Sequence, residues 1–142
     1  MNLNELIFSL LLILQHEYGI NENIHPPQLH IVSRTQLIQM ACISGCNQVR
    51  GWTPPGVSIY LDNTLDLESN IQDQSILLHE LVHYVQYQYE LDVLSSECLT
   101  WKTREAKAYQ LQIKWLQSQR ESIEELGLHR VQQRLYRLKC PP

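Results

Sequence analysis

Apolar residues recur along most of the chain with the three- to four-residue period of an amphipathic helix. This period predicts a first helix that starts at Leu3 and ends near Gly19, followed by the helices at residues 34–43, 71–89, 95–119 and 122–138, the last interrupted near Gly127. Residues 28–33 and the alternating residues 57–61 suit strands, and residues 51–56 suit a loop. The pattern therefore predicts a mostly helical α+β fold with a small sheet packed beside the helix at residues 71–89.

The length and composition fit one soluble domain over residues 1–142. A chain of 142 residues, 44% hydrophobic and 18% charged, can bury a core without help from a metal. Its net charge of -4 argues against nucleic acid as a partner, because phosphate binding needs a clustered basic surface. Four basic residues recur near the C-terminus, and we interpret them as a solvated helix face: Arg130, Arg134, Arg137 and Lys139.

The apolar run at residues 6–14 is too short to span a bilayer, so no stable membrane span is expected. No Lys or Arg precedes it and no small-residue cleavage site follows, which favours a packed helix over a secretory leader. The absence of these leader features favours a cytoplasmic protein. An apolar N-terminal run and four cysteines would also suit a periplasmic or secreted one.

The cysteines permit disulfides without demanding them. Cys42, Cys46, Cys98 and Cys140 fit buried thiols or one disulfide. One hypothesis is a disulfide that joins the loop at residues 42–46 to Cys98, near the candidate site.

The main chemical signal is the H-E-x-x-H motif from His79 to His83. In a helix the two histidines lie one turn apart on one face, and Gln86 continues that face. The opposite side is apolar and would hold the helix rigidly against its neighbours. The two imidazoles are therefore candidate ligands of one metal ion.

Glu105 is the candidate third ligand, because it is a carboxylate on an otherwise inward, aromatic-rich face of the next helix. A buried carboxylate needs a cation, and no Lys or Arg on its own face supplies one. His79, His83 and Glu105 would leave a tetrahedral zinc ion with one open position, as in catalytic sites. Glu80 lies about 100° around the helix from His79 and is the candidate general base for a water molecule activated by one Zn²⁺.

These residues resemble the gluzincin branch of zinc metallopeptidases, which combine an H-E-x-x-H helix with a glutamate-bearing helix. The resemblance covers roughly residues 57–116 and is closest to small bacterial peptidase-like domains of uncharacterised function. It implies a zincin-like fold, zinc ligation by His79, His83 and Glu105, catalysis by Glu80, and a peptide or protein substrate. It also implies that the strand at residues 57–61 is an edge to which an extended peptide adds.

The chain departs from that family at Tyr109, four residues after the candidate ligand glutamate. Many gluzincins carry an acidic residue there, which orients a histidine ligand. A tyrosine cannot accept as a carboxylate does, but it can donate a hydrogen bond to a ligand or to a developing oxyanion. We therefore expect a zinc metallopeptidase with Tyr109 as a candidate oxyanion donor. The alternatives are a non-catalytic zinc-stabilised binding module and, third, a metal-free helical interaction domain.

Overall fold

The computed structural model describes residues 2–41, 49–119 and 125–140. Its elements run in the following order: α1 (Leu3–Glu17), β1 (Gln28–Val32), α2 (Arg34–Ala41), β2 (Gly51–Trp52), β3 (Ser58–Asp62), α3 (Ile71–Gln88), α4 (Glu97–Ser118) and α5 (Glu125–Tyr136). The prediction of a mostly helical α+β fold with a small sheet is confirmed. The last helix was predicted to be interrupted or recapped near Gly127. α5 begins at Glu125 and passes through Gly127 without a break, so the interruption is wrong, and residues 122–124 lie outside the described residues.

Polar side chains cap the first turns of three helices, which explains why the helices begin where they do. The side chains of Asn2, Asn70 and Ser96 accept hydrogen bonds from backbone N–H groups at 2.9, 3.0 and 3.1 Å. Each bond satisfies a donor that has no partner within the helix. The caps on α3 and α4 thus set the register of the two helices that carry the candidate metal ligands.

The three strands form one sheet in the order β1-β3-β2. β3 pairs in parallel with β1 and antiparallel with β2, which places Gly51 opposite Leu61 and Trp52 opposite Tyr60. Two predictions are therefore wrong. Residues 51–56 contain a short strand as well as a loop, and the strand predicted at residues 57–61 lies in the centre of the sheet. Among the described residues, β2 is the edge strand beside α3.

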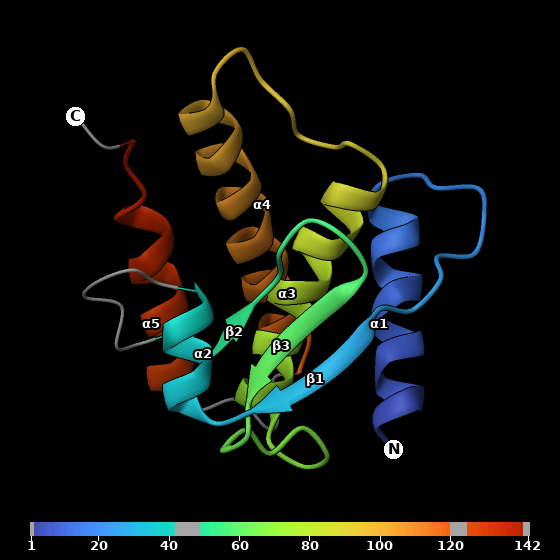
Figure 1. Cartoon of the computed structure of the whole chain (residues 1–142), viewed down its shortest axis with the longest axis vertical. Coiled ribbons are helices and arrows are strands. Elements are labelled where there is room, and N and C mark those ends of the chain that lie inside the picture. The colour runs from blue at the N-terminus through green and yellow to red at the C-terminus, as the bar shows by residue number, and fades with distance from the viewer. Residues whose placement is uncertain (1, 42–48, 120–124, 141–142) are drawn as a thin grey trace.

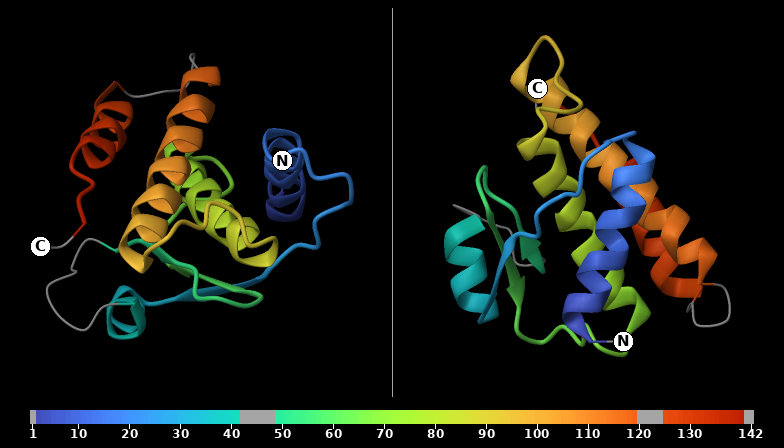
Figure 2. Two further views of the ribbon diagram at one scale, coloured as in Figure 1. Left: turned by 90° about the horizontal axis from the view of Figure 1, so that it is seen from above. Right: turned by 90° about the vertical axis from the view of Figure 1, so that its right-hand side faces the viewer.

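The helices cover both faces of the sheet. Figures 1 and 2 show α2 on one face and α3 on the other, with α3 lying between the sheet and α4. Seen from above in Figure 2, α1 and α5 flank this central region on opposite sides. α3 is consequently the most enclosed helix, and side chains on nearly all its faces are buried.

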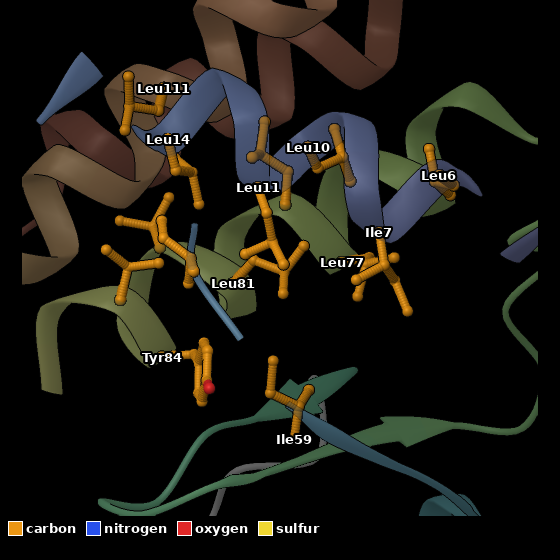
Figure 3. Close-up of a cluster of buried hydrophobic side chains, with 14 of the residues drawn as sticks. Leu6, Ile7, Leu10, Leu11, Leu14, Ile59, Leu77, Leu81, Tyr84 and Leu111 are labelled. Atoms are coloured by element: carbon orange, nitrogen blue, oxygen red, sulfur yellow. The ribbon is translucent and has the colours of Figure 1, made fainter. Parts of the chain in front are cut away.

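The core lies where α1, α3 and the sheet meet (Figure 3). Leu10 and Leu14 of α1 are fully buried, as are Leu77 and Leu81 of α3 and Ile59 of β3. Burial of each such side chain contributes about 1.5–3 kcal/mol. The predicted packed first helix is confirmed, and the apolar side of the H-E-x-x-H helix is held as expected.

A disulfide joins Cys98 near the start of α4 to Cys140, and the two cysteines are 42 positions apart in sequence. The hypothesis that Cys98 pairs with residues 42–46 is therefore wrong, and Cys42 and Cys46 lie outside the described residues.

None of the described helices combines the length and apolar character that crossing a bilayer requires.

Candidate metal centre

The structure brings His79, His83 and Glu105 together. One nitrogen of each imidazole and one oxygen of the carboxylate all lie within 4.8 Å of one another. Nε2 of His83 is 3.2 Å from Nε2 of His79 and 2.6 Å from Oε1 of Glu105, and the His79–Glu105 distance is 3.4 Å. The packing of α3 against α4 thus produces the three-residue cluster expected from the sequence.

A buried hydrogen-bond chain fixes the orientation of His79. The hydroxyl of Ser75 donates to the carbonyl of Gln72 at 2.6 Å, so its oxygen accepts from Nε2 of Gln112 at 3.0 Å. Oε1 of Gln112 therefore faces Nδ1 of His79, at 3.0 Å. Since an amide oxygen only accepts, Nδ1 carries the proton and the lone pair of neutral His79 is on Nε2, toward Glu105.

Gln86 fixes His83 in the same way. Nε2 of Gln86 donates to a carboxylate oxygen of Asp92 at 3.1 Å and to the carbonyl of Arg104 at 3.2 Å. Its Oε1 must then face Nδ1 of His83, at 2.9 Å, and accept the proton there. Asp92, held by the hydroxyl of Tyr18 at 2.8 Å, adopts a positive φ of 58° that brings its side chain back to α3. Both imidazoles thus present Nε2 to the same point.

The donor set fits a zinc ion. Ligand atoms at about 2.0–2.2 Å from a tetrahedral zinc are separated by about 3.3 Å, close to two of the three separations observed here.

The shorter His83–Glu105 contact suits a shared proton. Burial by itself lowers the pKa of His83, but the hydrogen bond to Glu105 and the charge of Glu80 outweigh it and raise the pKa to about 9. Burial works against ionisation of Glu105, yet the two histidines hold its pKa well below the usual range.

Glu80 lines the same cleft as the three candidate ligands and lies on the side of α3 that faces the sheet. The hydroxyl of Thr53 is within hydrogen-bond distance of Oε1 of Glu80, at 2.9 Å, and of its backbone carbonyl, at 3.1 Å. A Cβ built on Gly51 would lie 2.7 Å from Cγ of Glu80, so only glycine leaves room for this side chain. Gly51 of β2 and the adjacent Thr53 thus position the candidate base. The charge of Glu80 contributes to the raised pKa of His83, which indicates that the two side chains are near each other.

An open cleft of about 1240 Å³ leads to the cluster. His79, His83, Glu80 and Glu105 lie along it, together with side chains from the α3–α4 connection, β2 and α5. The ring of Tyr109 packs on His79 with centroids 4.5 Å apart. Burial and the charge of Glu105 raise the pKa of Tyr109 to about 12, so the phenol keeps its proton near neutral pH and remains a donor.

Sequence reasoning missed several contributors to this site. Trp101 belongs to the aromatic-rich face that was predicted to point inward, but it is 48% exposed and lines the cleft. Sequence reasoning identified no function for Thr53, Gly51 or Gln112, whose roles depend on which elements pack together. Gln86 carried a signal, because it follows the histidines on the same face of α3.

Replacing Gln112 by Met is expected to lower zinc affinity by about 10- to 100-fold, the usual effect of removing a partner of a metal-binding histidine. Met has nearly the same shape but offers no amide oxygen to His79. Competition with a fluorescent zinc chelator measures the effect. Gln110→Met on the exposed side of α4 is the matched control. Equal affinities for the two variants would contradict this role of Gln112.

Zinc binding is expected to release about one proton from His83 at neutral pH, because the metal must displace the proton that the raised pKa retains. Affinity should therefore increase with pH and level off above about 9. In the metal-free protein the same shift stabilises the fold below pH 6.5, and this contribution is lost as pH rises through about 9. Calorimetry in buffers of different ionisation enthalpy counts the protons. A pH-independent affinity would argue against a protonated His83.

A search of curated proteins and a search of solved structures each found no significant match to this chain. The model of one protein family, described as a domain of unknown function (DUF6647), matches residues 1–127. This segment contains β2, α3 and α4, and with them the three candidate metal ligands and Glu80. The chain therefore belongs to the DUF6647 family.

Proposed function

We propose that this protein is a zinc-dependent hydrolase, a metallopeptidase of the gluzincin type that cleaves peptide bonds. The observation that carries the proposal is the convergence of two Nε2 atoms and a carboxylate oxygen beside the buried Glu80, at an open cleft. A purely structural histidine pair would not need both rings turned to one point. Nor would such a pair need a carboxylate beside the two rings that is itself held by Thr53 and Gly51.

His79, His83 and Glu105 would hold the ion. Zinc in such a site supplies Lewis acidity, which makes water a better nucleophile and a carbonyl a better electrophile. Glu80 accepts a proton from water and returns it to the leaving amine. Thr53 donates to Glu80 and keeps its carboxylate directed, while Tyr109 is a candidate donor to the negative charge that develops on the carbonyl oxygen.

A peptide in extended form suits the cleft. β2 is the edge strand of the described sheet and lies next to Glu80, so its free edge offers backbone hydrogen bonds to a substrate strand. This assigns to β2 the role expected for residues 57–61. The exposed side chains of Val93, Leu94 and Trp101 line the same cleft and offer apolar contacts to substrate side chains.

The test is metal analysis combined with a cleavage assay on protein purified without chelators. We expect close to one zinc per chain, and hydrolysis of some members of a diverse peptide library as detected by mass spectrometry. A chelator should stop hydrolysis and added zinc should restore it. Zinc binding without any cleavage would favour the non-catalytic binding module, and a protein that binds no metal would favour the helical interaction domain.

A further inference from the structure

α5 contributes one residue, Arg134, to the lining of the cleft, and its side chain is exposed, as predicted for the basic residues near the C-terminus. Arg134 of α5 lines the cleft together with Tyr109, Glu105 and Gln112 of α4. Its charge acts on Tyr109, where it opposes the rise in the pKa of the phenol. The ring of Tyr109 packs on His79, so Arg134 lines the same cleft as the candidate metal ligands.

Among the described residues that line this cleft, Arg134 is the arginine whose charge is left for a ligand. Of the other arginines in the described lining, Arg50 forms an ion pair with Asp62 at 3.1 Å, and Arg104 donates to the carbonyl of Leu91 at 3.0 Å. The guanidinium group of Arg134 makes no hydrogen bond or ion pair within the described part of the chain. A guanidinium group without a partner, facing a cleft, is suited to bind a carboxylate through two hydrogen bonds.

The helix that carries Arg134 is held at both ends. At its start, Gly127 lies against the end of the Gln72 side chain on α3, since a Cβ built on this glycine would be 2.5 Å from Cδ of Gln72. Beyond its end, Cys140 is bonded to Cys98 on α4. Val131, between these points, is buried. Arg134 is thus presented from a helix with a defined place beside α4 (Figure 2).

We propose that Arg134 binds a carboxylate group of the ligand and so directs this cleft toward peptides that carry a negative charge near the bond at the metal. This proposal depends on the proposed function in one respect, because the hydrolase proposal is what places the scissile bond at the metal. The carboxylate is either the C-terminus of the peptide or an Asp or Glu side chain. Arg134 and Cys140 lie beyond residue 127, where the family match ends, whereas the three metal ligands lie within it. Metal binding and ligand selection are therefore separate in sequence.

The test measures binding rather than cleavage. Zinc-loaded Glu80→Gln protein is titrated by calorimetry with two sets of N-acetylated peptides from the cleavage library. In the first set, each peptide is compared as a free acid and as a C-terminal amide. In the second set, amidated peptides are compared that have either Glu or Gln at one position. We expect about tenfold or tighter binding of one charged form. A preference for the free acid identifies the C-terminus, and a preference for Glu identifies a side chain.

Arg134→Gln should remove the preference, Arg134→Lys should retain part of it, and Arg130→Gln on the exposed side of α5 should leave it unchanged. A preference that persists in Arg134→Gln would mean that zinc itself or another group binds the carboxylate, and would overturn the proposal. Equal binding of charged and neutral peptides, or binding of none, would overturn it as well. Because no turnover is needed, failure of the hydrolase proposal alone would leave this result intact.

Discussion

Glu80→Gln is expected to lower the rate of peptide hydrolysis by about 100- to 10,000-fold while the protein keeps its zinc. Glutamine has almost the shape of glutamate but cannot take a proton from water. Thr53 can still donate to the amide oxygen, and Gly51 still leaves space for the side chain. The variant should therefore fold and bind metal as the wild type does. Steady-state cleavage rates and zinc content, measured on the same preparation, test this expectation.

Glu68→Gln is the matched control for this experiment, because it removes one carboxylate from an exposed site outside the cleft. It should cleave peptides at the wild-type rate. Full activity of zinc-loaded Glu80→Gln would exclude Glu80 as the base. An equal loss in both variants would point to a general effect of charge.

Glu105→Gln is expected to weaken zinc binding by more than about 100-fold, which exceeds the effect of losing an outer partner such as Gln112. The substitution removes the only carboxylate of the three-residue cluster, and a neutral amide oxygen is a poorer ligand for a divalent cation. It also removes the acceptor of the His83 proton, so the pKa of His83 should fall from its raised value. Competition titration measures the first effect and NMR titration of the imidazoles measures the second.

Glu97→Gln provides the control for Glu105→Gln. Glu97 is on the same helix and lines the same cleft, but it is not part of the three-residue cluster. Its replacement should change zinc affinity only slightly. If Glu105→Gln binds zinc as well as Glu97→Gln does, Glu105 is not a ligand.

Much of the fold could be predicted because long helices repeat their apolar residues many times. The buried leucines and valines of α3 repeat with helical spacing from Leu77 to Val85, and the caps at Asn70 and Ser96 lie where the periodic segments begin. The same periodicity placed His79, His83 and Glu105 on facing sides of two helices. For such elements, local sequence and tertiary packing favour the same structure.

The remaining features depend on contacts between distant segments. β2 has two residues in a segment rich in Gly and Pro, and only its pairing with β3 makes it a strand. Trp101 shares a helix face with Glu105 but lies near the start of α4, where this face borders the cleft. Arg134 has the spacing of a solvated residue, and the packing of α5 beside α4 alone reveals that it lines the cleft.

The Cys98–Cys140 bond connects the cleft to the redox conditions around the protein. Where thiols are oxidised, this bond ties the end of α5 to α4, and bonds of this kind contribute about 2–4 kcal/mol to stability. In a reducing compartment, α5 would be held only by contacts such as those of Val131 and Gly127. The candidate metal ligands on α3 and α4 would keep their places, but the helix that carries Arg134 would gain freedom. If Arg134 selects ligands as proposed, the range of ligands would then differ between compartments, even though the proposed metal chemistry would not.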